Sequence, residues 1–450
     1  MRSVSGLRGI VGEDLVPALV TRYAEAFGSF LAARGGRVVA LARDSRQSGP
    51  AFVAAAAEGL VASGVDVVDL GMVPTPTAQL AVETLEGGLA GGIVVTASHN
   101  PVEWNALKFV GPGGRFLAKA EAEALFALVD AGGRHPGARA GTRRRDETAV
   151  GRHLDRVLGL PWLDLAPIRA RRFRVALDCV RGAGATIMPA LLEALGCEVR
   201  AINLEADGRF PREPEPIPEN LGELGALVRE SRSDLGIAVD PDVDRLALVD
   251  ETGRAIGEDY TLAFAVRAVL ARRQGPVVTN LSTSLVVEDA AREHGVAIER
   301  SPVGEANVVE RMAAAGAVIG GEGNGGVILP AVHLGRDAPV AATLALALLA
   351  ARGMTVSALV NSAPRYTIVK AKVPRPSGTL EQCYAALGRS VAGAAADRQD
   401  GLRLALADRW VHVRPSGTEP VVRIIAEAPT REAAEALVER GRAALTEGGR

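Results

Sequence analysis

A serine at the end of an apolar stretch is the first candidate for chemistry in this sequence. Residues 92–95 predict a buried strand, which runs into the polar segment TASHNP at residues 96–101. A tight loop there would hold Ser98 rigidly, with His99 and Asn100 beside it. Because a serine hydroxyl is a weak nucleophile at its ordinary pKa, covalent group transfer needs neighbours that activate it. We interpret Ser98 as a candidate nucleophile, with an ordinary polar turn as the alternative.

Three carboxylates stand close together in DPDVDR, at Asp240, Asp242 and Asp244. Ionised carboxylates 4 Å apart repel one another by about 1 kcal/mol per pair in water and more when desolvated, so a cation is expected. Ligands with only oxygen atoms favour a hard ion such as Mg²⁺. A calcium loop is disfavoured because its sixth position is Arg245, where the sharp turn needs glycine. An exposed acidic turn is the remaining alternative.

Two further loops carry groups that suit an anion and a sugar. RPSGTEP combines a guanidinium, two hydroxyls and a glycine, at Arg414, Ser416, Gly417 and Thr418. Together with backbone N–H groups these could cradle a phosphate, although a plain β-turn would use similar residues. GEGNGG places Glu322 and Asn324 between glycines, and both side chains suit bidentate hydrogen bonds to vicinal sugar hydroxyls.

Nearly every positive charge in the sequence is an arginine. The four lysines are Lys108, Lys119, Lys370 and Lys372. Lysine can exchange a proton at working pH and arginine cannot, especially when the lysine is partly buried near other cations. Lys108 follows Ser98 by ten residues, and we interpret it as a candidate proton carrier. The alternative is that it is one of four lysines without a special role.

The sequence contains three copies of the pattern of strands and helices that must position these loops. A strand, a polar loop, a helix ending at glycine and a second strand follow one another in residues 37–71, 174–203 and 275–304. Each unit is followed by another apolar strand, and these strands run into TASHNP, DPDVDR and GEGNGG. Because open α/β sheets bind ligands beyond the carboxyl ends of their strands, the loops are expected to share a cleft.

The predicted fold class is α/β, with three βαβ-type mixed-sheet domains around one cleft and a C-terminal α+β domain. The pattern changes after Pro364, and RPSGTEP there connects two predicted strands. We expect domain boundaries at residues 1–150, 151–250, 251–364 and 365–450. Residues 132–148 are rich in Gly and Arg and predict a linker or surface loop, with a solvated basic cluster at residues 143–145.

Composition narrows the function class. The 450 residues are 48% hydrophobic and 4% aromatic with a net charge of −2, which argues against nucleic-acid binding. The three isolated cysteines fit a reducing compartment. No secretory signal opens the chain, and the longest uncharged run, residues 338–351, is short of the roughly 20 residues that span a bilayer. We expect a cytoplasmic protein in which that run is a buried helix.

TASHNP, DPDVDR, GEGNGG and RPSGTEP occur in this order, one in each predicted domain, and the sequence thereby resembles the α-D-phosphohexomutase family over essentially its whole length. The opening SGLRGIVG is similar to the arginine motif at the N-terminus of that family and implicates Arg8. FPREPEPIPENL and SPVGEANV also have family counterparts. GEGNGG followed by HLGRDA, together with PRYTIVKAKV, is most like the phosphoglucosamine mutases of the family.

The resemblance implies a mechanism. Ser98 would be carried as a phosphoserine, with its phosphoryl group bridging to one Mg²⁺ held by the three aspartates. The phosphate of the substrate would bind RPSGTEP, and its hydroxyls would bind Glu322 and Asn324. Transfer from Ser98 would give a bound 1,6-bisphosphate that turns over and returns the other phosphate. A glucose or hexosamine 1,6-bisphosphate would act as activator.

Further roles follow from what this chemistry needs. Arg8 and Arg245 would neutralise charge on the transferred group. Lys108 and His99 are both candidates for the proton transfers. Since water must be excluded, the C-terminal domain is expected to close as a lid.

Other readings stay open. Several hexose-specific relatives have a histidine where this chain has Gly326, which disfavours glucose or mannose more than glucosamine. The alternatives are a phosphomannomutase/phosphoglucomutase, a metal-dependent phosphosugar phosphatase and a non-catalytic sugar-phosphate sensor. The expected partner is a small phosphosugar, with no nucleic acid or membrane, and the protein would be a monomer or a homodimer.

Overall fold

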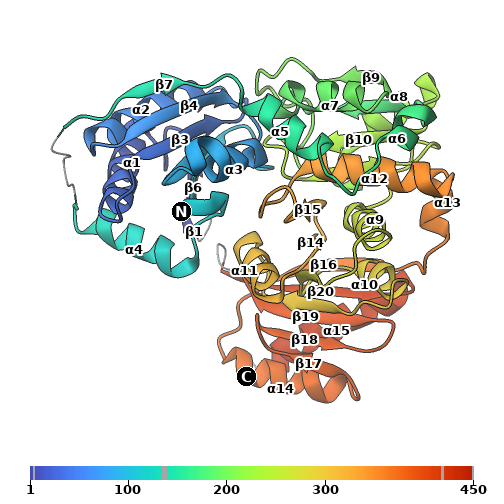
Figure 1. The fold of residues 1–450 in the computed structure, drawn as a ribbon. Helices are drawn as coiled ribbons and strands as arrows, with labels where there is room; N and C mark the ends of the chain where they lie inside the picture. The colour runs from blue at the N-terminus through green and yellow to red at the C-terminus, as the bar shows by residue number, and fades with distance from the viewer. Residues whose placement is uncertain (4–5, 134–138, 417–419, 448–450) are drawn as a thin grey trace.

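The computed structural model describes residues 1–3, 6–133, 139–416 and 420–447. In these residues the strands form four sheets, each built from its own stretch of chain. Figure 1 shows the resulting bodies in chain order, the first in blue, the second in green, the third in yellow and orange, and the last in red. The order of elements confirms the predicted fold class of three mixed-sheet domains followed by an α+β domain.

The first sheet is built around a strand that is apolar on both faces. In spatial order its strands are β1 (Arg2–Ser3), β2 (Gly6–Ile10), β6 (Trp104–Val110), β5 (Gly91–Val95), β3 (Val38–Arg43), β4 (Asp66–Met72) and β7 (Arg143–Arg145). The main helices are α1 (Pro17–Ala32), α2 (Gly49–Ala62), α3 (Thr75–Thr84) and α4 (Lys119–Asp130). Ile93 and Val95 of β5 share a core with α1, α2 and α4, whereas Val94 shares one with α3. Helices on both faces explain why β5 is a continuous apolar run.

The second and third sheets repeat this plan in shorter form. The second is ordered β11 (Leu246–Val249), β10 (Leu235–Val239), β8 (Arg174–Asp178), β9 (Glu198–Ile202). The third is ordered β13 (Ile298–Ser301), β12 (Val277–Asn280), β14 (Ile319–Glu322), β15 (Gly326–Ile328). Their helices are α5 (Ala149–Leu158), α6 (Ala166–Arg171), α7 (Met188–Ala194), α8 (Gly222–Ser231), α9 (Asp259–Leu270), α10 (Leu285–Arg292), α11 (Glu305–Ala315), α12 (Ala338–Arg352) and α13 (Val356–Asn361). Short 3-10 turns occupy residues 85–87, 112–114, 183–186 and 218–220.

In each of these three sheets, a candidate loop lies where a parallel strand is followed by an antiparallel one. β5, β10 and β14 each pair in parallel with one neighbour and antiparallel with the strand that follows them in sequence. TASHNP, DPDVDR and GEGNGG are the connections at these reversals. Because each loop follows the carboxyl end of a parallel strand, each lies where open α/β sheets bind ligands.

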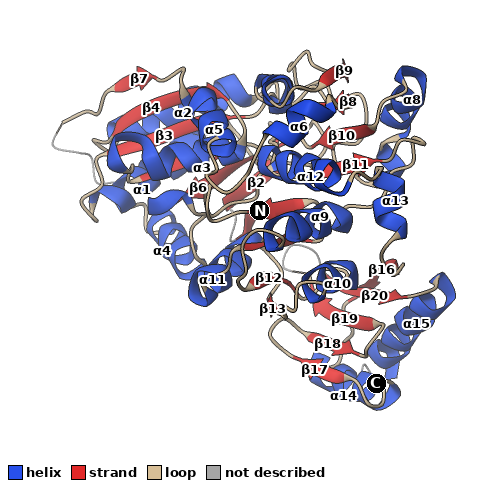
Figure 2. Ribbon diagram, turned by 45° about the vertical axis from the view of Figure 1, so that its right-hand side comes forward, coloured by secondary structure: helices blue, strands red, loops and turns tan. Residues whose placement is uncertain are grey.

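The fourth sheet is antiparallel throughout. Its strands are β16 (Thr367–Pro374), β20 (Val421–Ala428), β19 (Trp410–Pro415), β18 (Leu402–Ala405) and β17 (Ala395–Asp397). Helices α14 (Leu380–Ser390) and α15 (Arg431–Glu447) share one core with it and lie side by side in Figure 2. RPSGTEP runs from the end of β19 to the start of β20, as the sequence predicts.

The two middle bodies share an apolar core, whereas the first and last have cores of their own. Helix α12 is the shared element, because its buried residues belong to one cluster with residues of both middle sheets. This helix is the uncharged run at residues 338–351, and it is buried as expected. Within the described part of the chain, no helix combines the length and hydropathy that crossing a bilayer requires.

The segment expected to be a linker contains a strand. β7 pairs in parallel with β4 at the edge of the first sheet. Its arginines are exposed, as predicted for the basic cluster, but Arg143 and Arg145 pair with Asp69 at 2.6 and 3.2 Å. The interpretation of residues 132–148 as plain linker is therefore wrong at residues 143–145, because carboxylates on β4 supply partners that the local sequence does not reveal.

Candidate active site

Ser98 lies in the turn between β5 and β6 with a positive φ of 51°. Its backbone N–H donates to Thr96 Oγ1 at 2.9 Å, and its Oγ donates to Asp240 Oδ2 at 2.9 Å. The residue is only 3% exposed. A positive φ costs a residue other than glycine on the order of 1 kcal/mol or more, so surrounding contacts must maintain it. The candidate nucleophile is thus held against the loop of the three aspartates.

Arg46, which the sequence reasoning did not single out, holds this turn in place. Its guanidinium donates to the backbone carbonyls of Ser98, Asn100, Pro101 and Trp104 at 2.6 to 2.9 Å. Its Nε also donates to Asp44 Oδ2 at 3.1 Å, and both side chains are fully buried. A charged Asp-X-Arg directly after a buried strand was the available signal, but the partners are about fifty residues away.

We expect the substitution Arg46→Met to lower the free energy of unfolding by about 3 to 5 kcal/mol. It would remove the charge opposite Asp44 and leave several buried carbonyls without a donor. Chemical denaturation of the two proteins gives the difference directly. The exposed Arg37 offers a matched control, and Arg37→Met should stay within about 0.5 kcal/mol of the original protein. Equal stability of Arg46→Met and the original would contradict the role assigned to Arg46.

The three aspartates converge on one point. Their ligand oxygens lie within 4.8 Å of one another. Thr75 Oγ1, at the start of α3, donates to Asp242 Oδ2 at 2.7 Å. The other oxygen of Asp242 and the Oδ1 of Asp244 are buried and have no hydrogen-bond partner among the described residues. Buried carboxylate oxygens without partners are costly, and a hard divalent cation supplies what they lack. The donor set fits such an ion, held by the three aspartates beside Ser98.

The aspartates of this loop differ strongly in pKa. Burial and the neighbouring charges of Asp244 and Asp242 raise the pKa of Asp240 well above its ordinary value. Burial also opposes ionisation of Asp242, but the charge and hydrogen bond of Lys108 outweigh it, and the pKa of Asp242 is lowered. Three buried carboxylates therefore share too little positive charge to ionise together, and a cation would correct this.

Lys108, on β6, belongs to the same cluster. Its Nζ donates to Asp242 Oδ2 at 2.7 Å and lies 3.6 Å from Asp244 Oδ2. Burial lowers the pKa of Lys108, but the two carboxylates raise it by more, so that its pKa is above the ordinary value. The sequence favours a lysine that releases its proton beside neighbouring cations. The carboxylates instead keep Lys108 charged.

The pKa of His99 is shifted in the opposite direction from that of Lys108. Its Nδ1 lies 3.3 Å from Ser98 Oγ. Burial lowers the pKa of His99 well below its ordinary value, and the positive charges of Arg245, Arg8 and Arg336 lower it further. The ring is therefore neutral near pH 7 and can accept a proton.

Two arginines that the sequence predicts as site residues lie beside Ser98 and the three aspartates. Arg8 Nη1 donates to Asn100 Oδ1 at 2.7 Å, in the same turn as Ser98. Arg245 Nη1 donates to Glu215 Oε1 at 3.0 Å, and its Nε lies 3.7 Å from Asp244 Oδ1. Glu215 comes from the proline-rich segment FPREPEPIPENL and also lies 4.0 Å from His99 Nε2. Sequence reasoning gave this glutamate no role.

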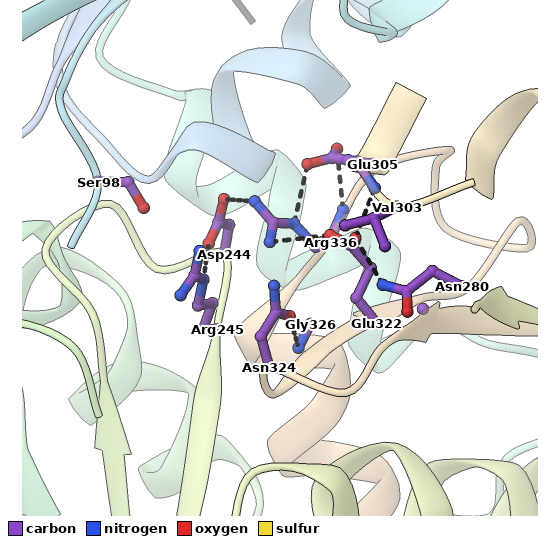
Figure 3. Close-up of polar contacts among 12 residues, drawn as sticks. Ser98, Asp244, Arg245, Asn280, Val303, Glu305, Glu322, Asn324, Gly326 and Arg336 are labelled. Carbon is purple, nitrogen blue, oxygen red and sulfur yellow. Dashed lines mark hydrogen bonds and ion pairs between the residues drawn. The ribbon is translucent and has the colours of Figure 1, made fainter. Parts of the chain in front are cut away.

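The loop GEGNGG is joined to the aspartates by one buried arginine. Arg336 Nη2 donates to Asp244 Oδ2 at 2.5 Å and Nη1 donates to Glu322 Oε2 at 3.3 Å. Asn280 Nδ2 and the N–H of Gly304 donate to the other oxygen of Glu322 at 2.9 and 3.0 Å. Asn324 Oδ1 accepts from the N–H of Gly326 at 3.1 Å. Ser98, Asp244, Arg336 and Glu322 follow one another across Figure 3.

A cavity of about 150 Å³ lies between this loop and the last sheet. Its polar lining includes Asn280, Glu322, Asn324, Lys370, Arg414 and Arg423. Arg414 Nε pairs with Asp400 Oδ2 at 2.7 Å, and the N–H of Ser416 donates to Val421 O at 2.9 Å. Gly417 and Thr418 lie outside the described residues. The structure therefore brings Glu322, Asn324 and Arg414 to one cavity and places Ser416 two residues further along.

A second cluster of possible metal ligands is held together by hydrogen bonds, and among the described residues only the Nδ1 of His333 in this cluster is buried without a partner. His153 Nε2 and His333 Nε2 lie 2.8 and 3.0 Å from Asp337 Oδ2. His153 Nδ1 in turn lies 2.8 Å from Thr77 Oγ1, on α3. Asp337 Oδ1 caps α12 by accepting from the N–H of Val340. We interpret this cluster as the contact that fixes the first sheet to the start of α12.

The comparisons with known proteins agree with this arrangement. Four models of the phosphoglucomutase/phosphomannomutase family match in order. They are alpha/beta/alpha domain I at residues 2–134, domain II at residues 152–253, domain III at residues 257–366 and the C-terminal domain at residues 368–444.

Curated relatives match over nearly the whole chain. A Methanopyrus kandleri protein named "Probable phosphoglucosamine mutase" is 39% identical over 438 residues, which are 96% of this chain and 95% of that protein. A Thermococcus kodakarensis protein named "Phosphoglucomutase/phosphomannomutase" is 36% identical over 445 residues, which are 97% of this chain and 96% of that protein.

A solved structure extends the likeness to the fold. The structure of a phosphoglucomutase/phosphomannomutase family protein from Burkholderia thailandensis has a TM-score of 0.87 to this chain at 30% identity and covers 100% of this chain and 98% of its own. Family models, relatives and fold thus agree over all four bodies. The chain belongs to the phosphoglucomutase/phosphomannomutase family of phosphohexomutases, which are isomerases that move a phosphoryl group within a sugar phosphate.

Proposed function

We propose that this chain interconverts the 6-phosphate and the 1-phosphate of a hexosamine, with glucosamine as the preferred sugar, through a phosphorylated Ser98 and a bound 1,6-bisphosphate. One observation carries the proposal. Ser98 Oγ contacts Asp240, the neighbouring Asp244 is bonded through Arg336 to Glu322, and Glu322 lines the cavity that Arg414 also lines. A donor hydroxyl, a cation site, a sugar site and a phosphate site thus follow one another.

The proposed reaction conserves phosphoryl groups. Phosphorylated Ser98 gives its phosphoryl group to the free hydroxyl of a sugar monophosphate, so that the bond from phosphorus to Oγ breaks and a bond to the sugar oxygen forms. The sugar hydroxyl loses a proton, and Ser98 Oγ gains one. The bisphosphate then turns end for end, and the reverse transfer places its other phosphate on Ser98. A 1,6-bisphosphate would therefore also load an unphosphorylated Ser98, which explains its expected role as activator.

Residues around Ser98 would neutralise the charge on the transferring phosphoryl group and carry the protons that the hydroxyls exchange. A bound Mg²⁺ would neutralise charge on the transferring group, with Asp240, Asp242, Asp244 and Ser98 holding it. Arg8 and Arg245 supply fixed positive charge at the same place. His99 is neutral and 3.3 Å from Ser98 Oγ, so it suits the role of proton acceptor. Lys108 is kept charged by Asp242 and Asp244, so it supplies positive charge at the cation loop, and it remains the alternative to His99 for the proton transfers.

We assign one task to each body, with the boundaries expected from the sequence. Residues 1–150 would carry the phosphoserine loop, residues 151–250 the cation loop, residues 251–364 the sugar loop and residues 365–450 the phosphate loop. Each loop lies in the range to which its task is assigned.

The preferred sugar distinguishes this proposal from the alternative of a general hexose mutase. The two relatives carry the names of both activities, a phosphoglucosamine mutase and a phosphoglucomutase/phosphomannomutase. Turnover should therefore be compared on glucosamine 6-phosphate, glucose 1-phosphate and mannose 1-phosphate, with Mg²⁺ and a trace of hexose 1,6-bisphosphate. The proposal expects the highest kcat/KM on the glucosamine substrate. A higher value on glucose or mannose phosphate would favour the general hexose mutase.

The same assay separates transfer from hydrolysis. A mutase keeps its phosphoryl groups, so inorganic phosphate should appear far more slowly than the isomeric sugar phosphate. Release of phosphate at a comparable rate would establish a phosphatase instead. Failure of all three sugar phosphates to react or to bind would overturn the proposed function.

We also propose that the last body closes over the cavity as a lid. It has its own apolar core, and polar contacts join it to the third body. His412 Nδ1 lies 2.8 Å from Ser282 Oγ, and Glu427 accepts from the hydroxyl of Ser284 and from the N–H of Leu285. Such contacts let one domain move relative to another without opening a hydrophobic core.

These contacts predict a dependence on pH. Burial lowers the pKa of His412 to about 4, so the folded protein disfavours the charged ring. Stability from the neutral ring is complete above the unfolded pKa of about 6.5 and is lost as the pH falls toward 4. Between pH 7.5 and pH 5 the loss from His412 should approach 2 kcal/mol. Urea unfolding at the two pH values measures it, and His412→Gln should have a smaller difference by about that amount. An unchanged difference would contradict the assigned burial of His412.

A further inference from the structure

We propose that Arg336 is a positioning residue that couples binding of the divalent cation to recognition of the sugar hydroxyls. The inference rests on the proposed function, because it assigns a task to a residue between its cation site and its sugar site. Among the described residues, no hydrogen bond joins Arg336 to Ser98, and Arg336 does not itself line the cavity. It acts through the carboxylates that it holds.

One guanidinium meets three carboxylates from different elements. Asp244 comes from the loop after β10, Glu322 from the end of β14 and Glu305 from the start of α11. Arg336 donates to them through Nη2, Nη1 and Nε at 2.5, 3.3 and 2.9 Å. The arginine is 7% exposed, and the carboxylates are similarly buried. Figure 3 shows the guanidinium between the three groups, with its dashed contacts running to each of them.

The contacts of Arg336 fix the orientation of Asp244 and of Glu322. Arg336 occupies Oδ2 of Asp244, whereas Oδ1 has no hydrogen-bond partner in the described part of the chain. It occupies Oε2 of Glu322, whose Oε1 is fixed by Asn280 and the N–H of Gly304. A planar fork holds two carboxylates at a set separation and angle, which a lysine ammonium cannot do. The position of Asp244 for the cation and that of Glu322 for the sugar are therefore set by one rigid group.

Glu305 and Gly326 also hold Arg336 in its position. Glu305 Oε1 accepts from the backbone N–H of Arg336 at 3.4 Å and from Gln79 Nε2, on α3, at 3.5 Å. The aliphatic part of Arg336 passes over Gly326, where a Cβ would lie 2.3 Å from Cδ of the arginine. Because that stem is fixed by three ion pairs, residue 326 has to be glycine for Arg336 to reach Asp244. Glu305 thus links the guanidinium to the first body as well.

Binding of the cation and binding of the sugar are coupled because both sites depend on the guanidinium of Arg336. A cation bound to Asp244 orders the loop that holds the guanidinium, and the ordered guanidinium in turn positions Glu322 for the sugar. Reciprocally, a sugar on Glu322 must tighten the cation by the same factor. We expect the cation and the sugar phosphate to strengthen each other about tenfold in the original protein, within the range usual for coupled sites.

The test measures this factor without turnover. In a Ser98→Ala background the affinity for Mg²⁺ is determined by titration calorimetry, alone and with saturating glucosamine 6-phosphate. The same pair of titrations is made on the Ser98→Ala protein that also carries Arg336→Lys. The ratio of the two affinities should fall from about ten to about one. Glu305→Gln, which only loosens the guanidinium from behind, should give an intermediate ratio and serves if Arg336→Lys does not fold.

A matched control separates coupling from loss of a buried arginine. Arg267 on α9 is 1% exposed and pairs with Glu293 at 2.6 Å, away from the site. Arg267→Lys should leave the ratio unchanged, even if it lowers the melting temperature. A ratio that stays near ten in Arg336→Lys overturns the inference while the proposed function stands. If no sugar phosphate binds the original protein, the proposed function fails and the inference fails with it.

Discussion

The substitution Ser98→Ala should abolish turnover, lowering kcat by at least about a thousandfold, while the protein stays folded. Without Oγ there is no atom to carry the phosphoryl group, and the remaining charges can bind the sugar phosphate but cannot donate to it. The lost hydrogen bond to Asp240 should cost about 1 kcal/mol of stability, which is small for a chain of this size. Turnover and thermal unfolding of the two proteins check both parts.

Intact mass adds a readout that does not depend on turnover. After incubation with a hexose 1,6-bisphosphate, the original protein should gain the mass of one phosphoryl group, and Ser98→Ala should not. Ser63 is a matched control, since it is equally buried and its Oγ donates to Leu60 O in α2. Ser63→Ala should keep both turnover and the mass gain. Normal turnover in Ser98→Ala would refute a covalent role for this serine.

The second large effect is a contrast between two aspartates of the cation loop. Asp240→Asn and Asp242→Asn should each lower affinity for Mg²⁺, and with it Mg²⁺-dependent turnover, by about a hundredfold or more, because each removes a charged ligand. Their stabilities in the presence of a chelator should differ. Since the pKa of Asp240 is raised, this carboxyl destabilises the folded protein at neutral pH, and an uncharged amide in its place removes that penalty.

Asp242 behaves in the opposite way. Its pKa is lowered, so its charge contributes stability above the unfolded pKa that is lost as the pH falls. Asp242→Asn leaves Lys108 buried without its closest charge and should lose about 3 to 5 kcal/mol. Urea unfolding in chelator at pH 7 should therefore rank Asp240→Asn at or above the original and Asp242→Asn well below it. The reverse ranking would contradict the charge distribution described above.

The general plan of the fold followed from local patterns. Apolar runs of strand length that end at polar loops predicted β5, β10 and β14, because a strand covered on both faces must be apolar along its length. The change after Pro364 to an α+β pattern was visible because the strands and helices there no longer follow the βαβ order. The resemblance of four loops in a fixed order added the family, which the full-length matches confirm. Residues 143–145 were misjudged, since an exposed edge strand has no apolar signature of its own.

The groups that orient the site were not predictable in this way. Arg46, Glu215 and Arg336 are charged residues in a chain where arginine and glutamate are common, and their partners are often distant in sequence. Nothing in the local sequence distinguishes a buried arginine with three carboxylates from an exposed one. The charge of Lys108 was likewise set by its neighbours, because the carboxylates of Asp242 and Asp244 outweigh the nearby Arg336.

By itself the sequence determined which segments become strands, which loops end them and which atoms those loops offer, because these depend on periodicity and on residue type over a few neighbouring positions. Only the tertiary structure decided which loops face one another, which side chains are charged and how one guanidinium joins the aspartates to the sugar loop. Those properties arise from burial and from charges brought together across domain boundaries, and both exist only in the folded chain.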